Sequence, residues 1–109
     1  MKKIKISEEY SDNPCTTIDG VIFRDVILFP YLVKAINNKG KIIIDFDDCY
    51  GVGLPFLREV FGGLIRVYNY KKKTILNTVE FISRDDETLI ESVHRYLNQA
   101  ENDIKNNKR

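Results

Sequence analysis

Residues 41–64 read Lys41-Ile-Ile-Ile-Asp45-Phe-Asp47-Asp48-Cys-Tyr50-Gly51-Val-Gly53-Leu-Pro55-Phe-Leu-Arg-Glu-Val-Phe61-Gly62-Gly63-Leu64. The aliphatic run at 41–46 predicts a central strand that is covered on both faces. After the two glycines, apolar residues recur at helical spacing from Pro55 onward, and proline suits the first turn of a helix because its missing N–H would have no partner there. In α/β proteins, ligands and partners bind in the crevice at the carboxyl end of such a strand, so we expect the functional site here.

The composition predicts one small domain with no strongly charged surface. We expect a single domain over residues 1–101 and a polar, fraying tail over residues 102–109. The 17 basic and 16 acidic residues argue against nucleic acid or an anionic membrane as the main partner. Two distant cysteines and one histidine make a zinc site or a disulfide framework improbable. With no long apolar segment, we expect a cytoplasmic protein without a cofactor or metal.

The remaining sequence predicts alternating strands and helices around the central strand. We expect further strands at 2–7 and 78–83, a weaker one at 15–18, a short helix near 72–76, and main helices at 21–37, from 55 onward and after 87. Asp19 is the expected cap of the first main helix, Pro30 should break it near Leu28-Phe29, and Val26 belongs to its apolar stripe. Gly62-Gly63 suggests a close approach of helix to sheet. The fold class is therefore an α/β sandwich with about four strands in a mixed sheet and three main helices.

Three carboxylates at the end of the central strand could carry chemistry. Asp45, Asp47 and Asp48 offer oxygen ligands for a divalent cation, and the aliphatic-Asp-x-Asp pattern resembles the first motif of haloacid-dehalogenase-type phosphatases. Cys49 stands where that motif usually has a hydroxyl residue, and the chain is short for that fold. A magnesium-dependent phosphohydrolase using Asp45 and Asp47 is therefore the alternative function, against the simpler interpretation of solvated loop acids and a helix cap.

Four other motifs have simpler explanations than chemistry. Asp85-Asp86 resembles an acidic pocket but fits a helix cap. Residues 68–73 mix tyrosines and lysines as single-stranded nucleic-acid sites do, although a solvated loop or a self-association surface explains them as well. His94 lies beside the apolar stripe of the last helix, and Gly51-x-Gly53 lacks the lysine and hydroxyl of a phosphate loop.

The segment from Ile42 to Leu64 resembles the signature of a bacterial and phage family, the STAS-like domains of unknown function. Supporting similarities lie at 6–11, 23–32 and 81–97, so that the resemblance covers most of the chain. It implies a fold like that of anti-sigma-factor antagonists, which are non-enzymatic regulators. Those proteins bind a histidine-kinase-like ATPase through the turn and helix after a central strand.

This resemblance implies a regulatory or adaptor protein with a docking surface for a protein partner. The implied partner-binding residues are Asp47, Asp48, Tyr50, Gly51, Gly53, Leu54, Pro55 and Phe56. In the wider superfamily the kinase phosphorylates a serine at the amino end of that helix, where free amides receive the phosphate. The corresponding residues here are Gly53, Leu54 and Pro55, which carry no hydroxyl, so we expect binding without a serine phosphoswitch.

Overall fold

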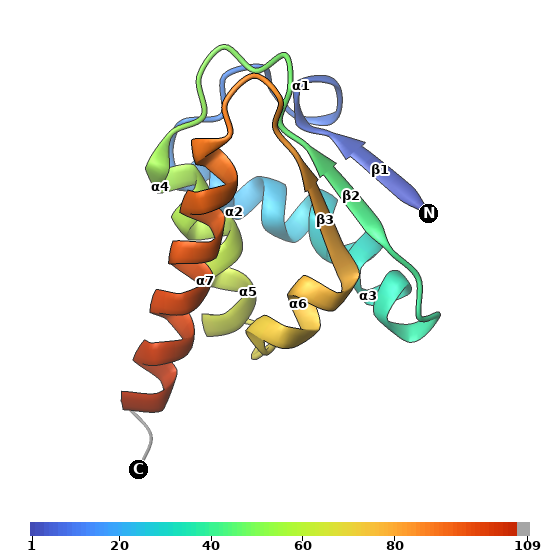
Figure 1. The fold of residues 1–109 in the computed structure, drawn as a ribbon, viewed down its shortest axis with the longest axis vertical. Helices are drawn as coiled ribbons and strands as arrows, with labels where there is room; N and C mark the ends of the chain where they lie inside the picture. The colour runs from blue at the N-terminus through green and yellow to red at the C-terminus, as the bar shows by residue number, and fades with distance from the viewer. Residues whose placement is uncertain (107–109) are drawn as a thin grey trace.

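The computed structural model describes residues 1–106, which fold into one layer of sheet and one of helices (Figure 1). The described residues form three strands, β1 (Lys2–Lys5), β2 (Ile42–Asp45) and β3 (Val79–Ile82), all parallel and in the order β1-β2-β3. The chain crosses from β1 to β2 and from β2 to β3 in the same direction across the sheet. Connections between parallel strands are right-handed, so the helices in both connections lie on the same face of the sheet. In Figure 1 no helix crosses in front of the sheet, so the face toward the viewer is open.

Two long helical runs make up most of the helix layer. The first joins α2 (Thr17–Ile22), the π-helical segment η1 (Phe23–Leu28) and α3 (Phe29–Asn37), and the second joins α4 (Leu54–Leu57), the π-helical segment η2 (Arg58–Gly62) and α5 (Gly63–Arg66). Short α1 (Ile6–Glu9), α6 (Lys72–Thr78) and the long α7 (Thr88–Asn106) complete the layer. The fully buried side chains between helices and sheet include Ile4, Phe23, Leu28, Ile44, Phe46, Phe56, Phe61, Val93 and Leu97.

The expected sheet of about four mixed strands is wrong, because residues 15–18 begin a helix. The Thr16 hydroxyl accepts a hydrogen bond from the Asp19 N–H at 3.0 Å, and the Asp19 carboxylate accepts from the Thr16 N–H at 3.1 Å. This capping box satisfies amides that a helix start leaves free. Within residues 1–106 the fold therefore has three parallel strands and five helical runs, and Thr16 is the cap in place of Asp19.

The break expected near Pro30 is instead a change of helical pitch. Pro30 stands at the second position of α3, and η1 directly precedes it, with the Phe29 N–H donating to the Arg24 carbonyl five residues back. A π-helical turn accommodates irregular hydrogen bonding without ending the helix. Residues 17–37 therefore form one continuous helical run.

Gly62 and Gly63 make room for arginines and do not bring the helix closer to the sheet as expected. A Cβ at Gly62 would lie 2.5 Å from the Arg66 guanidinium, and one at Gly63 would collide with the guanidinium of Arg24. The glycine pair therefore lets two bulky cations lie against the second helical run.

The first part of the expected tail belongs to α7, which continues to Asn106. Residues 102–106 are helical where we expected fraying. The rest of that expected tail, residues 107–109, lies outside the described part of the chain.

Candidate functional site

The three carboxylates at the end of β2 and in the turn after it connect the strand ends at the carboxyl edge of the sheet. Asp47 is buried; its Oδ1 accepts from the Arg84 and Asp85 N–H groups at 2.7 and 3.1 Å, and its Oδ2 from Arg84 Nε at 2.7 Å. Asp48 pairs with Lys5 of β1 at 2.6 Å. Asp45 accepts from the Asp47 N–H at 2.8 Å. These contacts fix the turn after β2 to the neighbouring segments.

Asp45 and Asp47, the two residues of the phosphohydrolase alternative, make their contacts within the protein. The hydrogen bond from Arg84, with help from the Asp85 and Arg84 amides, keeps the pKa of Asp47 below its usual range. All the hydrogen bonds that the Asp47 carboxylate accepts come from the loop after β3. Asp45 is fully buried, and its Oδ2 lies 3.4 Å from Lys3 Nζ on β1. Among residues 1–106 no cluster of three acidic, histidine or cysteine side chains could hold a metal ion. The geometry therefore favours a structural role for Asp45 and Asp47.

The two glycines of the turn serve packing against the segment before α2. The Tyr50 N–H donates to the Asp12 carbonyl at 2.6 Å, and the Gly53 N–H donates to the Pro14 carbonyl at 3.0 Å. A Cβ at Gly53 would collide with the backbone of Cys15. Glycine is needed at position 53 because another chain segment crosses it.

The structure divides the eight partner-binding residues that the resemblance implies. Tyr50 and Leu54 are 89% and 48% exposed, and Asp48 and Pro55 are also exposed. Gly51 and Gly53 are half-buried, whereas Asp47 and Phe56 are buried and support the turn from inside. Phe56 lies in the core, with its ring centroid 5.6 Å from that of Phe23. The accessible apolar part of the predicted surface therefore consists of Tyr50, Leu54 and Pro55.

A second group of exposed apolar side chains lies on α2 and η1 and was missed from the sequence. Ile18 and Val26 are 70% and 68% exposed, and Ile22 between them is exposed as well. We expected Val26 in the buried stripe of this helix, so that expectation is wrong. Helical spacing shows only that the residues share a face, and a stripe toward solvent has the same spacing as one toward the core. The stripe begins at Ile18 on α2, the helix that packs against α4.

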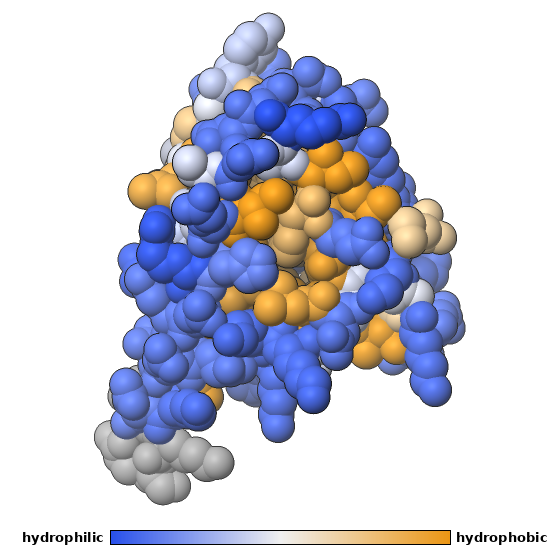
Figure 2. Space-filling model, viewed as in Figure 1, coloured by the Kyte–Doolittle hydropathy of each residue, from blue (hydrophilic) through white to orange (hydrophobic). Residues whose placement is uncertain are grey.

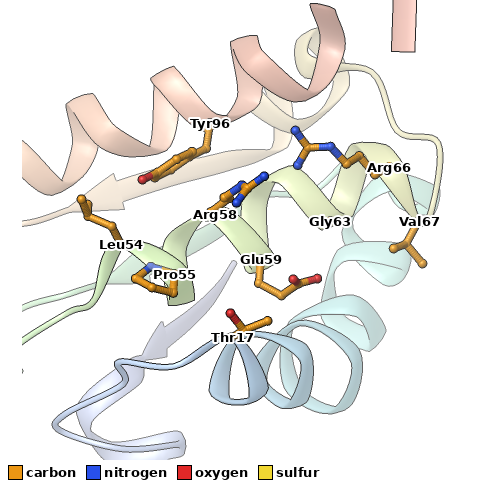
Figure 3. Close-up of a pocket in the computed structure, with 9 residues that line it drawn as sticks. All are labelled: Thr17, Leu54, Pro55, Arg58, Glu59, Gly63, Arg66, Val67 and Tyr96. Carbon is orange, nitrogen blue, oxygen red and sulfur yellow. The ribbon is translucent and has the colours of Figure 1, made fainter. Parts of the chain in front are cut away.

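A cavity of about 580 Å³ separates the start of α2, the second helical run and α7 (Figure 3). Leu54 and Pro55 line one end, and Arg58, Arg66 and Tyr96 line its walls. Figure 3 shows the Tyr96 ring extending from α7 toward the second helical run. The exposed turn therefore lies beside a cavity whose walls are partly apolar and partly cationic.

A partly buried ion pair lies next to this cavity, which Glu59 lines. The Arg24 guanidinium donates to the Glu59 carboxylate at 2.7 Å, to the Glu59 carbonyl at 2.9 Å and to the Asp25 carboxylate at 2.8 Å. Gly20 allows the close crossing of the two helical runs here, because a Cβ would lie 2.7 Å from the Glu59 Cβ. The helices that carry Ile18 and Leu54 are thus held at a fixed spacing.

The other candidate residues have structural roles or stay at the surface. Tyr68 stacks on Phe29 with 3.9 Å between ring centroids, and its hydroxyl donates to Asp25. Asp86 accepts from the Thr88 N–H at 3.0 Å, which confirms the acidic cap of the last helix. His94 is exposed on α7. Burial raises the pKa of the Cys49 thiol to about 11.

Comparison with known proteins identifies a family for most of the chain. The family model described as "STAS-like domain of unknown function (DUF4325)" matches residues 19–89, a range that includes the turn after β2 and the second helical run. Neither the comparison with curated proteins nor the comparison with solved structures finds a significant match. No helix within residues 1–106 is long and apolar enough to cross a bilayer.

Proposed function

This chain belongs to the family of STAS-like domains of unknown function, and we propose that it is a non-enzymatic regulatory or adaptor protein that binds a protein partner. The binding surface is the turn and helix after β2, together with the neighbouring face of α2. We expect a protein partner because of the family likeness. We place the binding surface at the turn because of the exposed side chains there.

The observation that carries this proposal is the outward position of apolar side chains at the turn. Tyr50 and Leu54 are exposed although the core below them is well filled, and the exposed Ile18 lies on the adjoining helix. Aromatic and aliphatic side chains of this kind form the buried centre of protein interfaces. The turn beneath them is held by Asp47 and by the contact between Gly53 and Pro14, so the surface is preorganised for a partner.

A histidine-kinase-like ATPase is the partner class that the family resemblance favours. In this proposal the partner binds without phosphorylating the start of α4, because Gly53, Leu54 and Pro55 have no hydroxyl group. Exchange of phosphate at that helix would need a serine or threonine there. The interaction is therefore regulated by the partner's own state or by the amount of either protein.

The proposal is tested by affinity capture from a lysate of the native cells, with captured proteins identified by mass spectrometry. We expect the double variant Leu54→Arg and Tyr50→Ala to lose a partner that the wild type recovers, because a cation then replaces an apolar contact. Ile104→Arg is the matched control, since Ile104 is about as exposed as Leu54 but lies near the end of α7.

Circular dichroism spectra must be the same for all three proteins. If the folded double variant recovers the same partner as the wild type, the turn is not the binding surface. Recovery of an ATPase-domain protein by the wild type alone would support the partner class as well as the surface.

A further inference from the structure

The face of the sheet that points away from the helices is open. Its side chains alternate along each strand with those that face the helices: Lys3 and Lys5 on β1, Ile43 and Asp45 on β2, Glu80 and Ile82 on β3. Ile43 and Ile82 are half-buried, and Lys3 and Glu80 are exposed. The described helices pack behind the other face, so nothing within residues 1–106 forms a second layer here (Figure 1).

An open face is unusual for a sheet of this kind. Sheets in which all strands are parallel occur almost only with both faces covered. Figure 2 shows hydrophobic atoms gathered over the sheet and beside α7, with hydrophilic residues around them. A shallow hollow of about 550 Å³ continues this area between β3 and α7, where Phe81, Ile82 and Ile90 line it. The face therefore has the apolar centre and polar rim of an interface.

The charges on this face change sign from one edge of the sheet to the other. The register places Lys3, Ile43 and Glu80 side by side in one row across the strands, in the order cation, apolar, anion. Glu87 and Glu91 line the hollow beyond β3 on the acidic side, and Lys5 on the basic edge is paired with Asp48. Arg84, the cation near these glutamates, is held by Asp47.

A face with this order of charges is complementary to a copy of itself. A two-fold axis that lies between two stacked sheets and runs along β2 brings β1 of one copy opposite β3 of the other. Lys3 of each copy then faces Glu80 of its partner copy, and the two Ile43 side chains meet near the axis. Asp45, the other β2 residue on this face, is already buried and paired with Lys3, so it does not present a free charge at the axis. Contacts in which residue i meets residue j, and j meets i, define a symmetric dimer.

We propose that the open face of the sheet binds a second copy of this chain, in a symmetric dimer held by Ile43 at its centre and by Lys3–Glu80 pairs on both sides. A partner of a single charge sign would match only one edge of this face. The face does not include Tyr50 or Leu54, so this inference and the proposed function can fail independently.

Sedimentation equilibrium of the full chain over a wide range of concentration tests the proposal. We expect the wild type to form dimers, and Glu80→Lys or Lys3→Glu to weaken them roughly tenfold or more, because like charges then meet at two symmetric positions. Glu8→Lys and Lys34→Glu are matched charge reversals at exposed positions outside this face and should leave the dimer unchanged.

Mixing the two single variants separates contacts between copies from effects within one copy. A heterodimer of Glu80→Lys with Lys3→Glu again joins opposite charges on both sides, so the mixture should regain the dimer affinity that each variant alone has lost. Ile43→Thr keeps a β-branched residue in the strand and should also weaken the dimer. This variant replaces Lys3→Glu as the test if loss of the Lys3–Asp45 ion pair unfolds Lys3→Glu.

A wild type that stays monomeric at every concentration would overturn the proposal, since another molecule would then have to cover the face. A dimer that Glu80→Lys leaves unchanged would overturn it too, because the contact would lie on another surface. Failure of the mixed variants to recover dimers, with both variants folded, would show that Lys3 and Glu80 do not meet between copies.

Discussion

Replacing Asp47 by alanine is expected to lower the free energy of unfolding by about 3 kcal/mol. The Arg84 and Asp85 N–H groups, at 2.7 and 3.1 Å from Asp47, lose a charged acceptor, which costs about 1.5 kcal/mol for each hydrogen bond, the low end for charged groups because Arg84 and Asp85 are exposed. The Arg84 guanidinium is 75% exposed, so water screens its ion pair with Asp47 and this pair adds little. The sum is a large part of the 5–15 kcal/mol that stabilises a typical domain.

The effect of this substitution should depend on pH in a defined direction. The hydrogen bond from Arg84 lowers the pKa of the Asp47 carboxyl in the folded protein. A carboxyl with a lowered pKa stabilises the fold fully above its unfolded pKa of about 4, and this contribution is lost as the pH falls through the folded value. The difference between wild type and Asp47→Ala should therefore be constant near neutral pH and shrink below about pH 4.

Urea unfolding followed by circular dichroism measures both quantities. Asp48→Asn is the matched control on the neighbouring residue, since asparagine tolerates the left-handed backbone at position 48, where φ is 67°, and only an exposed ion pair is lost. It should cost less than about 1 kcal/mol. An Asp47→Ala variant no less stable than Asp48→Asn would refute the structural role of this carboxylate.

Two further substitutions test the segment before α2 that supports the turn. The hydrogen bond from the Tyr10 hydroxyl lowers the pKa of Asp19 to about 2, so Asp19→Asn should cost about 1–2 kcal/mol at neutral pH after allowance for partial exposure. Thermal unfolding from pH 7 to pH 2 should show this loss of stability disappearing in acid. A loss that stays constant with pH would contradict the capping role of Asp19. Gly53→Ala should cost about 2 kcal/mol or more in the same assay, because its Cβ collides with the Cys15 backbone, whereas Gly40→Ala has room and should change stability by less than about 1 kcal/mol. Equal stability of the two alanine variants would show that the segments do not pack closely at Gly53.

The sequence predicts the central strand and the helix after it because their signals are local. The aliphatic run at 41–46, the glycine turn and Pro55 each restrict a few neighbouring residues, and the structure places β2 and α4 accordingly. Residues 15–18 were misassigned because short β-branched segments suit both a strand and a helix start. The capping box between Thr16 and Asp19 decides in favour of the helix. Its spacing is present in the sequence, but aspartate stands where the usual box has glutamate or glutamine, so the signal is weak.

The accessible part of the site could not be deduced from the sequence. Asp47 and Phe56 belong to the same motif as Tyr50 and Leu54, yet the fold turns the first two inward and the second two outward. The exposed stripe of Ile18, Ile22 and Val26 has the periodicity of a core face, and only the position of the helix in the layer separates these cases. The glycine pair at 62–63 likewise depends on arginines whose positions follow from tertiary packing.

Amide hydrogen exchange of the chain, with and without the captured partner, tests the central claim most directly. Our account predicts slower exchange on binding at the turn and start of α4, residues 49–57, and at the start of α2, residues 17–22. It predicts no comparable change at the carboxyl end of α7, near Ile104. Protection confined to α7 or to the open face of the sheet, with residues 49–57 unchanged, would contradict the claim that the turn after the central strand is the docking surface.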